Sequence, residues 1–108
     1  MGLDAAVYRD DDEDEKIMSA HLGNVSMISY LHRAIREHAP ASAILLSKVL
    51  YSGSHCGDSL TNNEVHQVKA ELDSVTKHLS GDPMVMEFVS SLRSVVDIAL
   101  LHDRPITF

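Results

Sequence analysis

The sequence predicts a mainly α-helical protein, a small four-helix antiparallel bundle that forms a single domain over residues 1–108. Apolar residues recur at spacings of three and four in several segments after residue 25, as in a helix with one buried face. Glycine or proline separates these segments, and such short connections are typical of antiparallel neighbours in a bundle. A chain of 108 residues with 44% hydrophobic residues can build one core.

The two ends of the chain have the composition of short strands. Residues 3–9 contain Val7 and Tyr8, and residues 106–108 are Ile-Thr-Phe, all of which favour extended structure. Because the termini of small domains are often close in space, the bundle can carry a short two-stranded β pairing of these segments. Residues 17–24 are ambiguous, because apolar residues lie beside the turn residue Gly23.

The first two helices are predicted on either side of Pro40. One helix begins after Asn24 or Ser26, either of which can cap it. Pro40 ends that helix and lies in the first turn of the next. Residues 41–51 are mostly apolar, which predicts a largely buried second helix that ends at Gly53.

The last two helices have the clearest boundaries. Thr61 and Glu64 match a capping box, and a surface helix follows over 61–79. Its apolar positions are spaced three and four apart, at Val65, Val68, Leu72, Val75 and Leu79. Asp82 and Pro83 begin the final helix as cap and first residue. Residues 84–101 are apolar over most of the circumference, so we expect this helix at the centre of the domain.

The formal charge is −7 at pH 7, and most of it lies in one run. Residues 10–15 are six consecutive acids, and without them the chain has ten acids against nine bases. Adjacent like charges repel one another when packed, so the run predicts a solvated acidic loop on a nearly neutral body. Nucleic-acid binders and polybasic membrane anchors need a basic surface, so neither kind of partner is expected.

Cysteine content and the apolar runs predict a cytoplasmic protein. Cys56 is the only cysteine, so no intramolecular disulfide and no oxidising compartment is required. The first residues lack the basic and apolar regions of a signal peptide. The longest apolar stretch contains Glu87, Arg93 and Asp97, which a transmembrane helix would not normally carry.

Motifs for metal or catalytic chemistry fail when tested one by one. An EF-hand loop from Asp10 has Asp12 and Asp14 in place, but Glu15 and His21 stand where it needs Gly and Glu. The five glycines form no phosphate loop, and the seven histidines and one cysteine lack zinc-ligand spacing. We therefore predict no catalytic, cofactor-binding or metal-binding residue, and a protein that is not an enzyme.

Reactive side-chain types are densest in residues 54–58, Ser-His-Cys-Gly-Asp. A site for a small enzyme or ligand-binding protein at this loop is one interpretation, with Cys56 as the thiol. Neighbouring side chains rarely point at each other productively, and catalytic Cys/His pairs usually come from distant positions. A structural or recognition loop is therefore favoured, with His55 and Asp58 as contact residues.

Residues 51–58, Tyr-Ser-Gly-Ser-His-Cys-Gly-Asp, precede the capped helix over 61–79. This arrangement resembles short bacterial proteins in which a loop rich in His, Ser, Cys, Asp and Gly precedes a helix that begins with Ser or Thr and acids. Some of those proteins are similar to immunity proteins of polymorphic toxin systems. Residues 1–4 and 105–108 add to the resemblance, although the order of His, Cys and Asp departs from the pattern. The resemblance implies a binding protein and supplies no catalytic residues.

The function predicted from these observations is non-enzymatic binding of another protein, in the manner of an immunity protein that neutralises a basic toxin or other basic partner. Acidic residues can steer such a partner. The predicted partner-binding residues are Asp11, Asp12, Glu13, Asp14, His55 and Asp58. The alternatives are a small enzyme or ligand-binding protein, and a structural homo-oligomer in which another subunit covers an apolar flank of helix 83–101.

Overall fold

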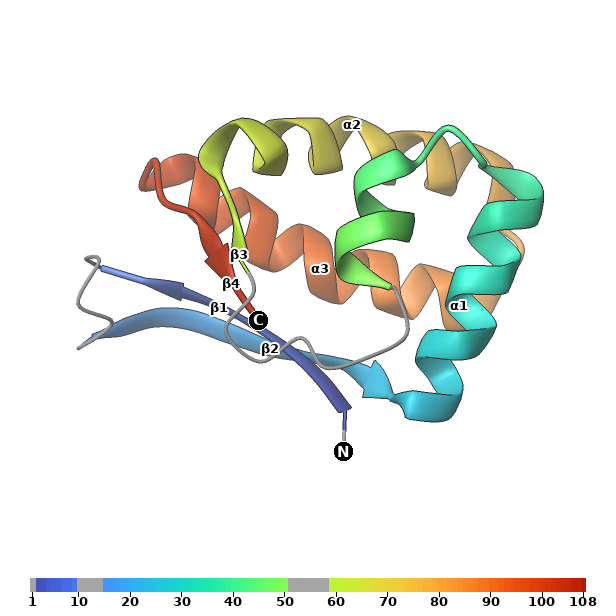
Figure 1. Ribbon diagram of the computed structural model, residues 1–108, viewed down its shortest axis with the longest axis horizontal. Coiled ribbons are helices and arrows are strands. Elements are labelled where there is room, and N and C mark those ends of the chain that lie inside the picture. The colour runs from blue at the N-terminus through green and yellow to red at the C-terminus, as the bar shows by residue number, and fades with distance from the viewer. Residues whose placement is uncertain (1, 10–14, 51–58) are drawn as a thin grey trace.

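The protein is an α+β fold, shown by a computed structural model that describes residues 2–9, 15–50 and 59–108. A four-stranded antiparallel sheet with strand order β2-β1-β4-β3 packs against three long helices (Figure 1). The elements in chain order are β1 (Gly2–Tyr8), β2 (Lys16–Asn24), α1 (Val25–His38), the π-helical segment η1 (Leu45–Val49), β3 (Ser59–Leu60), α2 (Asn62–Leu79), α3 (Pro83–Leu101) and β4 (Ile106–Thr107). The predicted four-helix antiparallel bundle is therefore wrong.

The sheet forms because the ambiguous residues 17–24 pair with β1. Ile17 beside Met18, and Leu22 beside Gly23, hide the alternation of a regular strand. The register between β1 and β2 shifts at both places, so β2 carries an extra residue at each, as in a β-bulge. The bulges let Ile17, Met18 and Leu22 all pack on the core in spite of their uneven spacing.

The two ends of the chain do pair, but inside this larger sheet. Ala6 of β1 lies opposite Thr107 of β4, and β4 pairs on its other side with Ser59 and Leu60 of β3. The expected two-stranded structure is therefore one of three pairings in the sheet. β3 carries no recognisable strand signal in the sequence, because two residues are too few to show a period.

The helices form two layers above the sheet (Figure 1). α3 packs on β1 and β2 on one side and on α2 on the other. Its apolar residues Val85, Phe88, Leu92, Val95, Val96 and Ala99 are all 1% exposed or less. The prediction that this helix lies at the centre of the domain is confirmed, because a helix that is apolar over most of its circumference needs cover on several sides.

The caps of α2 and α3 lie where the sequence placed them, and Asn24, one of the two alternatives for α1, caps that helix. The Asn24 side chain accepts a hydrogen bond from the amide of Met27 at 2.9 Å. Thr61 and Glu64 form the reciprocal capping box, and Asp82 caps α3. Lys48 also bonds Glu64, and this ion pair, with the Thr61 amide, lowers the pKa of the Glu64 carboxyl. Caps were predictable because they depend on residues three positions apart.

The second predicted helix is shorter than residues 41–51. Regular helical structure covers only 43–49, with η1 as its larger part. The buried carboxylate of Glu71 on α2 accepts hydrogen bonds from the amides of Ile44 and Leu45 at 3.1 and 2.9 Å. Gln67 donates a third hydrogen bond to it at 3.1 Å. A side chain far along the chain thus satisfies the first amides of this helix, which helical spacing could not reveal.

Membrane-spanning potential can be judged for the helices of the described residues. None of them is both long enough and apolar enough to cross a bilayer.

Candidate functional site

The outer face of the sheet, which the three long helices leave open, is the first candidate site (Figure 1). Side chains alternate between the faces of a strand, so Leu3, Ala5 and Val7 of β1 point toward the helices and are 4% exposed or less. Asp4 and Tyr8 occupy the alternate positions and point outward. Their partners across the strand pair are His21 and Lys16 of β2.

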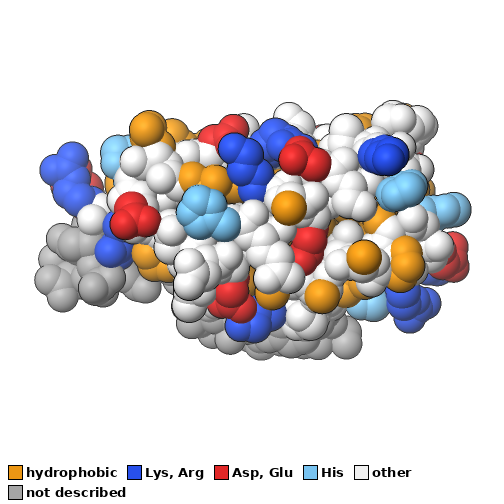
Figure 2. Space-filling model, turned by 90° about the horizontal axis from the view of Figure 1, so that it is seen from above, with side chains coloured by type: hydrophobic (Ala, Val, Ile, Leu, Met, Phe, Trp, Pro, Cys, Tyr) orange, Lys and Arg blue, Asp and Glu red, His pale blue; other side chains and the backbone are white. Residues whose placement is uncertain are grey.

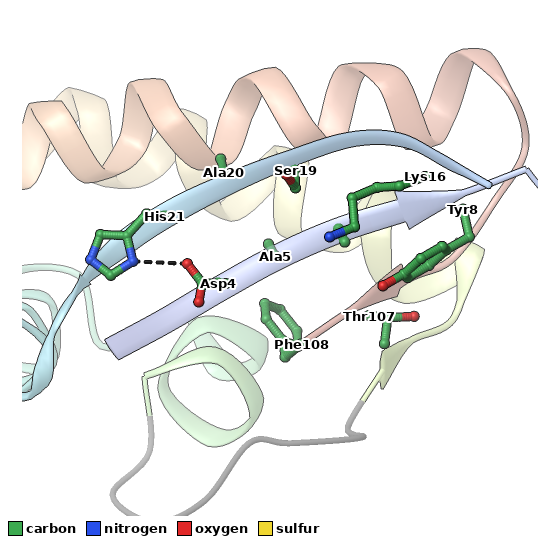
Figure 3. Close-up of a pocket in the computed structure, with 10 residues that line it drawn as sticks. Asp4, Ala5, Tyr8, Lys16, Ser19, Ala20, His21, Thr107 and Phe108 are labelled. Carbon is green, nitrogen blue, oxygen red and sulfur yellow. Dashed lines mark hydrogen bonds and ion pairs between the residues drawn. The ribbon is translucent and has the colours of Figure 1, made fainter. Parts of the chain in front are cut away.

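Small side chains form the floor of this outer face. One row of opposed residues crosses all four strands, and its members are Ser19, Ala6, Thr107 and Ser59. Larger side chains stand on either side of this row, and the hollow between them has a volume of about 380 Å³. Figure 3 shows Asp4 and His21 at one end of the hollow and Tyr8 with Lys16 at the other.

Asp4 and His21 form a carboxylate–imidazole pair across the first two strands. Nδ1 of His21 lies 2.8 Å from Oδ1 of Asp4, and the carboxylate can only accept, so Nδ1 carries the proton (Figure 3). The second ring nitrogen is then left to accept or donate outside the pair. The side chain of His21 is 61% exposed and that of Asp4 is 71% exposed, so water screens the interaction between them.

The other end of the hollow is cationic and aromatic. The ammonium group of Lys16 lies 5.8 Å from the centre of the Tyr8 ring, which is a cation–π distance. The Tyr8 carbonyl accepts a hydrogen bond from Nε of Arg104 at 3.0 Å, which ties this end of β1 to the segment after α3. Phe108 adds a second ring to the lining of the hollow.

The groups that line the hollow are of mixed chemical kinds. Asp4 and His21, at one end of the hollow, lie largely in water. No cluster of three or more His, Cys, Asp or Glu side chains in the described part of the chain could hold a metal ion. The surface offers instead two aromatic rings, hydroxyls and charges of both signs, which are groups that protein interfaces use.

A second hollow of about 440 Å³ lies between α1 and the start of α3. The hydroxyl of Tyr30 donates a hydrogen bond to Oδ2 of Asp82, while Oδ1 of Asp82 accepts from the amides of Met84 and Val85. The hydrogen bond from Tyr30 lowers the pKa of Asp82, and the same bond raises the pKa of Tyr30. Because Asp82 caps α3, we interpret this contact as a tie between two helices.

The surface on the α2 side of the molecule lacks a comparable concentration of contact groups. Figure 2 shows cationic, anionic and apolar side chains interspersed there, with the apolar ones in small separate patches. Single apolar side chains scattered among charged ones are common on protein surfaces. We therefore place the candidate site on the sheet.

The partner-binding residues predicted from the sequence lie outside the residues that the structure describes. They are Asp11, Asp12, Glu13, Asp14, His55 and Asp58. The alternative site at 54–58 lies there as well. Of the acidic run, the described residue Glu15 pairs with Arg9, by a 2.8 Å backbone hydrogen bond and a 3.4 Å ion pair.

Sequence reasoning missed the residues of the hollow. Asp4 and Tyr8 lay in a predicted strand with the right spacing to share a face. Lys16 and His21 stand in or next to a segment that was left ambiguous, so their partners could not be assigned. The signal that could have found these residues is the alternation of apolar residues in 17–24, which is interrupted twice, as expected for a strand with two bulges.

Comparisons with protein families, with curated proteins and with solved structures found no match to this chain.

Proposed function

We propose that this chain is a non-enzymatic protein-binding module of the cytoplasm, of the immunity-protein type, which contacts a basic partner through the outer face of its sheet. The observation that carries the proposal is the open outer face, where Asp4 and His21 are 71% and 61% exposed. A face of this kind leaves its contact groups in water until a partner covers them. Covering them by another protein strengthens their hydrogen bonds and charge interactions, since water no longer screens them.

The shape of the hollow favours a protein over a small molecule. Sites for small molecules bury most of the ligand surface in a cleft lined mainly by apolar groups. This hollow is floored by short side chains across β1, β2 and β4 and opens onto the sheet surface (Figure 3). A protein partner can have a surface complementary in shape to this hollow and can contact the whole outer face.

The charge distribution favours a basic partner. The acidic run ends at Glu15, directly before Lys16 at the start of β2. Asp4 adds a further carboxylate on the outer face. With a net charge of −7, the chain attracts a cationic protein, and such attraction raises the association rate and weakens with salt.

The test compares capture of partners by three matched proteins in extracts of the organism that encodes the chain. Thr107→Arg places a large cation in the middle of the outer face. Ala70→Arg, at an exposed position of α2, makes the same change in charge and size elsewhere. We expect one basic protein to be captured by the wild type and by Ala70→Arg. Thr107→Arg should bind the purified partner at least about tenfold more weakly, which corresponds to about 1.4 kcal/mol.

The acidic run is tested separately with the purified partner. Replacing Asp11, Asp12, Glu13 and Asp14 with their amides should slow association at low salt and flatten its dependence on sodium chloride. Equal binding of the partner by Thr107→Arg and Ala70→Arg would contradict the proposed face. An unchanged salt dependence in the amide variant would contradict steering by the acidic run.

A further inference from the structure

β2 is the longest edge strand of the sheet that the described residues form. β2 has nine residues and stands at the end of the strand order, whereas the opposite edge strand β3 has only two (Figure 1). Within 2–9, 15–50 and 59–108, β1 is the only strand that pairs with β2. Between its two bulges, over residues 18–21, β2 is a regular strand, and the edge of a regular strand presents unpaired amides and carbonyls that readily form hydrogen bonds with a further strand.

We propose that two copies of this chain associate through β2, in antiparallel orientation about a two-fold axis at Ala20, so that the two sheets join into one. This goes beyond the proposed binding of a basic partner, because it uses the edge of the sheet and leaves its outer face open. An isologous contact of this kind needs a strand that is complementary to itself.

The side chains of β2 meet that requirement. Antiparallel neighbours place residues of the same face opposite each other. With Ala20 on the axis, Ser19 of one copy lies opposite His21 of the other, and both are exposed side chains of the outer face. Ala20 then faces its own counterpart, and a small side chain at that point leaves room for both strands. This register brings no pair of like charges into opposition.

α3 adds a second layer to the contact. Its ion pair from Arg93 to Asp73, at 2.9 Å, fixes the side that faces α2. At 100° per residue, Ser91 and Ile98 lie on roughly the opposite side of the helix, and both are half-buried. Since α3 packs behind β2, a two-fold axis at Ala20 brings the two α3 helices toward each other, and the short Ser91 side chain permits their approach.

The antiparallel arrangement also separates the two copies of Glu15, the described end of each acidic run. Each run ends immediately before Lys16, four residues from the axis. Because two of the residues of β2 are bulged, Lys16 to Asn24 spans only the six rises from Tyr8 to Gly2 of β1, so the two Lys16 positions are about 20 Å apart at 3.4 Å per rise. Repulsion between exposed charges is largely screened beyond about 8 Å at physiological salt. The net charge of −7 on each copy therefore does not oppose this contact strongly.

The first experiment measures the mass of the intact chain by sedimentation equilibrium from low to high micromolar concentration. We expect the weight-average mass to rise toward twice that of one chain. Ala20→Lys and Ala20→Glu place like charges against each other at the axis, so each alone should stay monomeric, and a mixture of the two should form heterodimers. A wild-type chain that is monomeric at high micromolar concentration overturns the proposal.

Disulfide trapping tests the register even if those charged variants fail to fold. In a Cys56→Ser background, Ala20→Cys should form a disulfide-linked dimer rapidly under mild oxidation, because the two side chains face each other. Ala70→Cys on α2, in the same background, is the matched control and should cross-link at least about tenfold more slowly. Equal rates for the two variants overturn the proposed axis. Thr107→Arg should dimerise as the wild type does in sedimentation equilibrium. This result would distinguish the β2 contact from the partner-binding face, which Thr107→Arg is designed to disrupt.

Discussion

The two faces of the sheet differ in almost every physical property, although the same strands build them. On the inner face Ala5 and Val7 are completely buried, and they pack with α3 in a continuous apolar core. On the outer face the neighbouring positions hold Asp4 and Tyr8, which lie at the surface. Burial of apolar area stabilises the fold, whereas exposed polar groups contribute little to it. The inner face therefore supplies stability, and the outer face is the one for which we propose recognition.

The largest effect is expected from Phe88, the largest side chain in the core, which is 1% exposed. Phe88→Ala should lower the free energy of unfolding by about 3–5 kcal/mol, because it removes buried contacts and leaves a cavity. Urea unfolding measures this as a lower midpoint with an unchanged slope. Met84→Ala is the control on the same helix, since Met84 is 39% exposed. A loss below about 1 kcal/mol for Phe88→Ala would show that this core packs loosely.

The next effect concerns Glu71, a charged side chain that is only 7% exposed. Glu71→Ala should cost about 2–3 kcal/mol, because the amides of Ile44 and Leu45 lose their acceptor. Hydrogen exchange should also accelerate at these two amides. Glu87→Ala, at an exposed position of α3, should change stability by less than about 0.5 kcal/mol. Unchanged exchange at Ile44 and Leu45 would mean that Glu71 does not hold this helix.

A smaller, pH-dependent effect is expected where α1 meets α3. Asp82 has a lowered pKa, mainly because Tyr30 donates to its carboxylate. A lowered pKa contributes stability above the unfolded value of about 3.9, and this is lost as the pH falls through the lower folded value. Tyr30→Phe should therefore be less stable than the wild type near neutral pH, and the difference should shrink in acid.

Unfolding of both proteins between pH 7 and pH 2 measures the difference, and carboxyl resonances report the Asp82 titration directly. Asp97→Asn serves as a control, since Asp97 is an exposed carboxyl on the same helix whose ion pair with Lys69 spans 3.9 Å. It should leave the Asp82 titration unchanged. Parallel stability curves for Tyr30→Phe and the wild type would remove the proposed link between these groups.

The smallest effect on stability is expected on the outer face. Asp4→Asn should change the free energy of unfolding by less than about 0.5 kcal/mol, because Asp4 and His21 are both largely exposed. The same substitution should weaken partner binding, since it removes a carboxylate from the proposed contact face. If Asp4→Asn lost as much stability as Glu71→Ala, the outer face would also contribute to folding, which would contradict the difference between the two faces.

Local features of this fold were predictable from the sequence. The caps at Asn24, Thr61 and Asp82 and the boundaries of α2 and α3 were read from residues a few positions apart. Each helical hydrogen bond joins residues four apart, so the information needed to place a helix lies within the helix. The same holds for the extended character of residues 3–9 and 106–108, which depends on side-chain composition.

The sheet and the candidate site were not predictable in the same way. β2 was left ambiguous because its two bulges interrupt the period of two, and nothing local shows which strand it pairs with. Glu71 lay on a helix whose positions between the apolar ones are nearly all polar, and only the packing of α2 against residues 43–49 buries it. Both errors arise because strand pairing and burial depend on residues far apart in the chain.

By itself, the sequence determined where α2 and α3 begin and end, that both end segments of the chain are extended, and that the excess negative charge lies in residues 10–15. The tertiary structure decided that β2 joins β1, that helices cover one face of the sheet, and that Asp4 meets His21 and Tyr8 meets Lys16 on the other. The physical reason is the range of the interactions. Helices and caps are closed by bonds between near neighbours, whereas a sheet face is assembled from strands that the chain brings together only on folding.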